Sequence, residues 1–387
     1  GTNNWGPRVG AAFTLTPQTV LRGGAGRYFS DPGSHTAYWT LMNASALQPQ
    51  IFNDGRADFA ANPFNGPTPT FDQVAATLCT VSSAPNCLRR STTNFAVEGN
   101  EIPYSNQASF GMQRQIGSTM AIEADYVYTA NRAMLVTLNA NLAYDPATGV
   151  NYPFTNTAKR PYPAWGDVSV RRTIGESDYH GLQMAFTKRM SDRWQASATY
   201  LLAGQWNLQN APAAGAGCVN PTTLMADGTP TCDVAFTLHP SLAEGWYLSP
   251  DQRHRFTFNG IWQIGAGFQA SGLYFYGDQG WATPSSGVDA LSSGSTGGRV
   301  RANGSLIPRN SFDIPSMHRV DARLQKQFRL SGNVSVEGII EAFNLFNHAN
   351  YASFTTNEAS ARFGQPTESV NVSYQPRMLQ FGFRASF

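Results

Sequence analysis

The sequence lacks any apolar run long enough to cross a membrane as a helix. No stretch approaches the roughly 18 consecutive apolar residues that such a span needs, and mean hydropathy is −0.31. Charge of one sign does not accumulate either, since 27 Lys and Arg stand against 25 Asp and Glu. A helical membrane protein is therefore excluded, and no nucleic-acid partner is expected.

Charged side chains are scarce, whereas turn-forming and aromatic residues are plentiful. Only 13% of the chain is charged and 41% is hydrophobic, with 36 Gly, 23 Pro, 24 Phe, 15 Tyr and 8 Trp. Such a composition is typical of strands joined by turns. It predicts an all-β protein.

Cysteine is also scarce. The four cysteines form two local pairs, Cys79 with Cys87 and Cys218 with Cys232, each in a polar segment rich in Gly, Pro, Ser and Thr. We expect two disulfides, formed in an oxidising compartment. The alternative is a metal site with four thiolate ligands, but such a site normally has C-x₂₋₄-C spacing, which is absent here.

Strand-like alternation runs through the chain. Between Thr119 and Ala130 every second residue is apolar, from Met120 to Tyr128, and most of the others are polar. A helix would spread these apolar residues around its whole surface. Ten further segments alternate in the same way: Arg8–Leu15, Thr19–Phe29, Tyr104–Ile116, Tyr179–Met190, Trp194–Trp206, Arg255–Ile264, Phe268–Tyr276, Arg319–Leu330, Val334–Phe346 and Met378–Phe387. The pattern thus predicts eleven strands.

The connections between these segments alternate in length. Short turns lie at Thr16-Pro17-Gln18, Gly117-Ser118, Ser191-Asp192, Gly265-Ala266 and Ser331-Gly332-Asn333, and long connections lie near residues 30–103, 131–178, 207–254, 277–318 and 347–377. Tight turns at one end and long extracellular loops at the other are typical of a transmembrane, antiparallel, up-and-down β-barrel of the bacterial outer membrane. We therefore expect residues 1–387 to form a single, partial β-barrel domain rather than a soluble sandwich.

One further segment, from Trp165 to Ile174, is also strand-like. We expect it to be an outer hairpin arm, set off from the wall by a turn at Gly175-Glu176-Ser177, because a further crossing would invert every later loop. The last strand then runs inward, and counting back eleven strands places the start of the first one outside. We expect Gly1 at the extracellular rim, preceded by further strands.

The two faces of the predicted strands differ in chemistry. One carries aromatic residues near the strand ends, as an interfacial girdle does: Tyr126, Tyr128, Trp194, Tyr200, Trp262, Tyr274 and Tyr276. The other carries charges: Glu123, Asp125, Arg255, Asp321, Arg323, Glu337, Glu341 and Arg384. In a barrel the apolar face meets lipid and the charges face the lumen. The solvent face of a sandwich would accept the same charges.

Several stretches, taken in order, resemble the C-terminal part of the TonB-dependent outer-membrane receptors, of the Oar-like type with a carboxypeptidase-regulatory-like domain. They are Asn4–Gly10, Thr19–Gly24, Ser177–Gln183, Asp251–Phe256, Glu341–His348 and the aromatic last strand. The resemblance implies a 22-stranded barrel, of which this chain would be the C-terminal half. It also implies a plug domain, absent from these residues, and coupling to the TonB complex through an N-terminal region that is absent too.

The last strand also resembles the signal by which such barrels are recognised for insertion. It places Leu379, Phe381, Phe383 and Phe387 at alternate positions. The alternative is that a lipid-facing strand must simply be apolar on one side. The partners we expect are the barrel assembly machinery, outer-membrane lipid and lipopolysaccharide.

Candidate ligand-binding residues are aromatic and lie in or beside the long loops: Tyr38, Trp39, Trp246, Tyr247 and Trp281. Their rings could stack on a ligand or pack the loops onto one another. The six histidines have no metal-ligand spacing, so neither a metal nor another cofactor is expected. His180 beside Asp178, or His254 beside Asp251, could supply part of a hydrolase site, but nothing positions a nucleophile for them.

The function we expect is therefore TonB-dependent uptake of an unidentified ligand, namely a siderophore, an oligosaccharide or a peptide, without catalysis. A passive channel or an adhesin-type barrel is the first alternative, and an outer-membrane hydrolase is the second.

Overall fold

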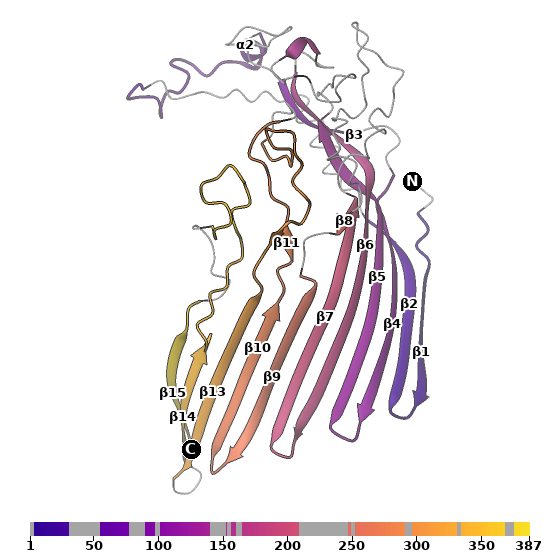
Figure 1. Cartoon of the computed structure of the whole chain (residues 1–387), viewed down its shortest axis with the longest axis vertical. Coiled ribbons are helices and arrows are strands. Elements are labelled where there is room, and N and C mark those ends of the chain that lie inside the picture. The colour runs from indigo at the N-terminus through magenta and orange to yellow at the C-terminus, as the bar shows by residue number, and fades with distance from the viewer. Residues whose placement is uncertain are drawn as a thin grey trace.

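The computed structural model describes residues 4–30, 55–76, 90–96, 101–139, 152, 156–159, 165–208, 247–248, 252–290, 296–330, 334–367 and 375–387. These residues form one large antiparallel sheet with loops gathered at one end (Figure 1). The described helices are the short α2 (Phe71–Ala75) and a 3₁₀ turn (Thr157–Lys159), and neither is long or apolar enough to span a membrane.

Eleven strands, neighbours in chain order, make up the wall of the sheet. They are β1 (Arg8–Thr16), β2 (Thr19–Phe29), β4 (Tyr104–Ile116), β5 (Met120–Asn139), β6 (Trp165–Ser191), β7 (Trp194–Leu208), β9 (His254–Gly265), β10 (Phe268–Gly277), β13 (Met317–Arg329), β14 (Ser335–Phe343) and β15 (Met378–Ser386). The eleven strands predicted from alternation are thereby confirmed.

Four shorter strands lie outside this wall. β3 (Arg90–Ala96) runs parallel to β6, and β8 (Tyr247–Leu248) pairs with β7. β11 (Trp281–Ala282) and β12 (Phe312–Asp313) form a small separate ribbon within the β10–β13 loop.

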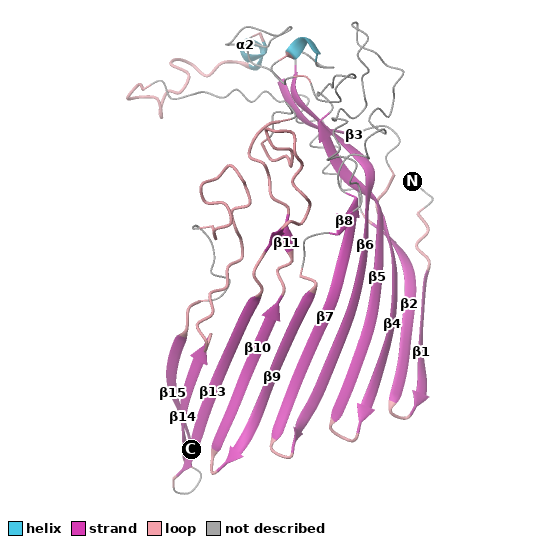
Figure 2. Cartoon of the chain, viewed as in Figure 1, coloured by secondary structure: helices cyan, strands magenta, loops and turns pink. Residues whose placement is uncertain are grey.

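Tight turns join the strands at one end of the wall, and the long connections all lie at the other end (Figure 2). Asp192 and Arg193 have φ of 52° and 71°, and Ala266 and Gly267 have φ of 47° and 80°. Two successive residues with positive φ form a type I′ turn, whose twist matches that of the strands it joins. β1 starts at the loop end and β15 finishes at the turn end, as the strand count predicts (Figure 1).

The β5–β6 hairpin departs from the expectation. Trp165–Ile174 belongs to β6 and pairs with the extended end of β5, so that Val136 lies opposite Arg172. The turn predicted at Gly175-Glu176-Ser177 is wrong, because a register shift between Asn131 and Val136 absorbs the irregularity without ending the strand. The segment still projects beyond the wall as an outer arm (Figure 1), and the number of crossings is unchanged.

Register shows which side chains share a face, because residues directly opposite one another project to the same side of a sheet. Tyr126 lies opposite Leu182, Leu182 opposite Leu202, and Leu202 opposite His254. We call this side the apolar face. Its large side chains are exposed, among them Phe13, Phe110, Phe258, Trp262, Leu324, Ile340 and Phe383. Phe383 is 83% and Phe13 64% exposed, so this face requires an apolar surrounding.

The outermost strands have open edges. β1 pairs with β2 and β15 pairs with β14, and within the described residues neither has a second partner. Every residue of both strands is exposed. An unpaired edge of this length is a template for a further strand.

Candidate functional site

The eight charged residues expected in a lumen share the other side of the sheet, which we call the polar face. Asp125 is in register with Gln183, Gln183 with Leu201, and Leu201 with Arg255. On the last three strands Arg323 lies opposite Glu341, and Glu337 lies opposite Arg384. The fold thus gathers charges from distant parts of the chain onto one surface.

Arg22 on β2 organises the charges at the N-terminal part of this face. Its Nε donates to Asp125 Oδ1 at 3.0 Å, and its Nη2 donates to Asp125 Oδ2 at 2.6 Å. The same Nη2 also donates to Glu123. Such a two-pronged guanidinium–carboxylate pair fixes both side chains in one geometry. Arg22 could not be identified from the sequence, because its partners lie two strands away and only the register brings them together.

Gly111 makes this contact possible. It lies between the two partners, opposite Arg22 on one side and Asp125 on the other. A Cβ atom at Gly111 would stand 1.8 Å from Asp125 Oδ1 and 3.2 Å from Arg22 Nε. The ion pair therefore occupies the space that any other residue at position 111 would fill.

A second set of charges lies on β13, β14 and β15. Arg319 Nε donates to both carboxylate oxygens of Asp321, at 2.8 and 2.9 Å. Arg323 Nη1 lies 3.5 Å from Glu341 Oε1, and Arg384 Nη1 lies 3.9 Å from Glu337 Oε2. Arg255 is held differently, with its guanidinium 5.6 Å from the centre of the Phe275 ring.

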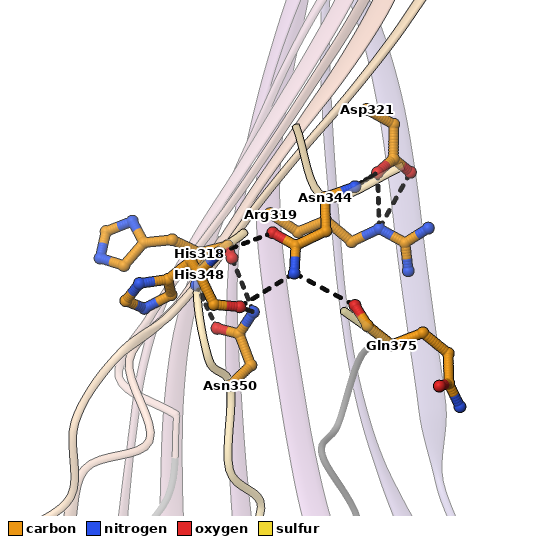
Figure 3. Close-up of polar contacts among 7 residues, drawn as sticks. All are labelled: His318, Arg319, Asp321, Asn344, His348, Asn350 and Gln375. Atoms are coloured by element: carbon orange, nitrogen blue, oxygen red, sulfur yellow. Dashed lines mark hydrogen bonds and ion pairs between the residues drawn. The ribbon is translucent and has the colours of Figure 1, made fainter. Parts of the chain in front are cut away.

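The stretch Glu341–His348 has a structural role at the base of the β14–β15 loop (Figure 3). Asn344 is 2% exposed, has φ of 50°, and donates through Nδ2 to the carbonyls of His348 and Gln375 at 2.9 and 3.1 Å. Its backbone N–H donates to Asp321 Oδ1 at 2.9 Å. Asn350, 1% exposed, exchanges two hydrogen bonds with the backbone of His318. This loop is therefore tied to the start of β13 as well as to its own two strands.

The β10–β13 and β14–β15 loops also contact each other farther out. Arg301 donates to both oxygens of Glu358 at 2.7 Å, and the Glu358 backbone N–H donates to Ser285 at 2.9 Å. Ile307 in the β10–β13 loop is buried, with 1% of its surface exposed, and its backbone N–H donates to the Arg299 carbonyl at 2.9 Å. The Arg301 guanidinium holds the pKa of Glu358 below its usual range. The two loops thus form one packed unit.

Three tyrosine–histidine pairs recur on the apolar face. Tyr126 Oη lies 2.6 Å from His180 Nδ1, Tyr200 Oη 2.7 Å from His254 Nδ1, and Tyr274 Oη 3.2 Å from His318 Nδ1. Each pair joins two adjacent strands whose connection is a long loop. From the sequence, these tyrosines were predicted to belong to a girdle, and His180 and His254 were considered only as part of a hydrolase site. The sequence signal that could have revealed these pairs is a histidine shortly after each of these three long loops.

Of the five predicted loop aromatics, only Trp281 has a described side chain. Tyr38, Trp39 and Trp246 lie outside the described residues, and of Tyr247 only the backbone, in β8, is described. Trp281 is half-buried in β11, opposite Asp313. The cysteines, Cys79, Cys87, Cys218 and Cys232, also lie outside the described residues, so their pairing stays a prediction.

The residue pair considered for a hydrolase has other partners. Asp178 accepts from Arg132 Nη1 at 2.7 Å, while His180 contacts Tyr126. His254 contacts Tyr200, and Asp251 lies outside the described residues. Over the part of the chain that the structure describes, no three His, Cys, Asp or Glu side chains gather as metal ligands would.

Comparison with known proteins agrees with this arrangement. Residues 1–296 and 279–380 match the family described as outer membrane beta barrel domain. No curated protein matches the chain significantly.

Three similar solved structures are far longer than this chain. The ferric-catecholate import receptor Fiu of Escherichia coli is 14% identical, with a TM-score of 0.44 over 98% of this chain and 34% of the receptor. The outer membrane transporter YddB of Escherichia coli is 10% identical, with a TM-score of 0.45 over 87% of this chain and 36% of the transporter. The siderophore receptor PiuA of Acinetobacter baumannii is 10% identical, with a TM-score of 0.46 over 98% of this chain and 35% of the receptor. The chain thus spans little more than a third of their length.

Replacing Gly111 with Ala should break the Arg22–Asp125 pair. We expect the full-length protein to lose up to about 1 kcal/mol of unfolding free energy, the scale of a solvent-exposed ion pair, measured by urea titration in detergent micelles. Gly338→Ala is the matched control, because a Cβ at Gly338 meets nothing within 4 Å. Equal effects of the two substitutions would contradict the proposed role of Gly111.

Replacing Asn344 with Ala should loosen the base of the β14–β15 loop. The carbonyls of His348 and Gln375 lose the donor that the buried Asn344 side chain supplies, at about 0.5–1.5 kcal/mol for each lost hydrogen bond. Asn344→Gly loses the same donor but tolerates the positive φ, so it should be less destabilising than Ala. Thermal unfolding of both variants checks this order, and the reverse order would refute it.

Acid should release the two loops from each other. The folded-state pKa of Glu358 is lowered, so its pair with Arg301 stabilises the loops above the usual glutamate pKa of about 4.3. That contribution is lost as pH falls through the lowered value. Hydrogen exchange of residues 296–307, corrected for intrinsic rates, should show falling protection over that window. In Glu358→Gln the protection should be lower and independent of pH there; an unchanged pH response would argue against the pair.

Proposed function

Because this chain belongs to the outer membrane beta barrel domain family, we propose that it forms part of the wall of a TonB-dependent barrel that takes up a ligand across the bacterial outer membrane. In that membrane the apolar face meets lipid. The polar face, with its paired charges, lines the lumen. The two-faced, eleven-stranded sheet is the observation that carries this proposal.

The number of strands favours a large barrel over a small closed one. Single-chain bacterial barrels have an even number of strands, whereas this wall has eleven and two open edges. Eleven is half of the 22 strands that large outer-membrane transporters use, and barrels of that size hold a plug. The charges paired on the polar face suit a surface that contacts water and a polar plug.

The loops provide the outward surface for a ligand. The β10–β13 and β14–β15 loops form a packed unit above the lumen edge of the wall, which is the kind of rigid base that a receptor needs. Trp281 lies at the root of this unit, and we propose that it contacts the ligand together with Tyr38, Trp39, Trp246 and Tyr247. The similar structures named as siderophore or ferric-catecholate receptors make a ferric siderophore the first ligand to test.

Uptake and conductance together test the proposal. Cells that make the full-length protein should accumulate a radiolabelled ferric catecholate, and should lose that accumulation when the TonB complex is deleted. The purified protein should give no steady conductance in a planar bilayer, because a plug fills the lumen. Steady conductance with uptake that does not depend on TonB would instead identify the passive channel.

Two variants test the loop surface within the same assay. Trp281→Ala should weaken ligand binding at least several-fold, as loss of a stacked ring does. Trp262→Ala is the control, because that ring is 57% exposed on the apolar face and lies away from the loops. Equal losses in both variants would point to a general defect of the barrel.

A further inference from the structure

The three tyrosine–histidine pairs lie at one height on the wall. Tyr200 and Tyr274 stand eight residues after the tight-turn residues Asp192 and Ala266, and Tyr126 stands nine after Gly117. At about 3.3 Å per residue and a strand tilt of about 40°, this is a height of roughly 20 Å above the turns. The lipid-facing band of such barrels is about 25 Å tall. The histidines lie beyond the tyrosines, toward the loops, and therefore where the lipid headgroups begin.

A fourth basic residue continues the same row. Arg27 on β2 is in register with Asn106, which is in register with Ala130, so Arg27 lies on the apolar face as well. Its Nε donates to Asn106 Oδ1 at 2.8 Å, and its guanidinium stands 4.6 Å from the Tyr104 ring centre. We call Arg27, His180, His254 and His318 the outer basic row. Each member lies at the base of one long loop.

Among the described residues, the acidic groups Asp178, Glu176 and Asp278 beside this row have other partners. Arg132 binds Asp178 at 2.7 Å and lies 3.9 Å from Glu176. Asp278 accepts from the Gly280 backbone N–H at 2.8 Å. The row therefore offers basic groups at the outer border of the apolar face, where the charge of Arg27 and the hydrogen-bond donors of the imidazoles are complementary to an anionic headgroup.

The tyrosines orient the imidazoles. When a tyrosine O–H donates to Nδ1, the neutral imidazole carries its proton on Nε2. That Nε2–H is then free to donate away from the tyrosine, and protonation would add charge without removing this donor. His180 is exposed, so its outward donor is accessible from the membrane side.

We propose that the outer basic row binds the phosphate groups of the outer-leaflet glycolipid. Arg27 supplies a permanent charge, and the three histidines supply outward Nε2 donors that their tyrosine partners hold in place. This would fix the height and rotation of the wall in the membrane. The inference needs only the outer-membrane location, so it stands apart from the proposed transport function.

Two amide substitutions separate headgroup binding from a merely structural strand contact. Asparagine places its amide near the position of Nδ1, so His180→Asn, His254→Asn and His318→Asn together keep a partner for each tyrosine and remove the outward donor. Glutamine reaches the position of Nε2, so the corresponding triple Gln variant keeps the outward donor and loses the tyrosine contact. If the outward donor binds the phosphate, the Asn variant should lose more lipid binding than the Gln variant; if only the contact between strands matters, the Gln variant should be the more impaired.

The experiment measures binding of diphosphoryl lipid A, and of a phosphate-free analogue, to the full-length protein by native mass spectrometry. We expect the triple Asn variant to bind the phosphorylated lipid at least about tenfold more weakly, because the loss of even one of the three charge-assisted hydrogen bonds corresponds to about that factor. The triple Gln variant should lose clearly less affinity than the Asn variant, because it keeps the outward donors although the tyrosines no longer hold them in place. The phosphate-free analogue should bind all three proteins equally.

Three results would overturn the proposal. They are equal binding of both lipids to the unaltered protein, equal loss in the Asn and Gln variants, and displacement of the lipid by inorganic phosphate at the same concentration. The last result would identify a site for free phosphate. Should a triple variant fail to insert, His180→Asn and His180→Gln give the same comparison at one position.

Discussion

The two-residue alternation of side chains, locked in register across eleven strands, is the constraint on which the rest of this structure depends. A slip of one residue in any strand would exchange its lipid side for its charged side. The tight turns fix the register at one end of the wall, where the I′ geometry at Asp192-Arg193 matches the strand twist. At the other end the strands are joined by long loops, and side-chain contacts such as those of Tyr126 and Asn344 hold them together.

Much of this wall could be predicted from the sequence, because a period of two is local information. All eleven strands were predicted, and most of their ends agree with the structure to within one or two residues. The outer arm shows the limit. Trp165–Ile174 looked separate because Gly175, Glu176 and Ser177 favour a turn, yet pairing with β5 carries the strand through them. The pairing with β5 outweighs the local preference of these three residues for a turn, and this pairing cannot be read from the sequence alone.

Of the candidate site, only the side of the sheet on which the charged residues lie could be predicted from the sequence. The charged residues were assigned to one side correctly, since alternation determines the side. Their partners were not, because Arg22 meets Asp125 only through the register of β2, β4 and β5, and through the missing side chain of Gly111. The contacts between tyrosines and histidines could not be predicted for the same reason. Their tyrosine partners lie about 50 residues away in the sequence but on the adjacent strand.

The central claim is that one face of this sheet meets lipid and the other meets water. Spin labels placed singly along β9 of the full-length protein, in its native membrane lipid, test it most directly. Labels at Phe256, Phe258, Gly260 and Trp262 should be reached by oxygen dissolved in the bilayer, and labels at Arg255, Thr257, Asn259 and Ile261 by a water-soluble nickel chelate. A two-residue period in both signals, opposite in phase, is the predicted result. Equal access of the chelate to both sets would contradict the account and leave the sheet as part of a soluble protein.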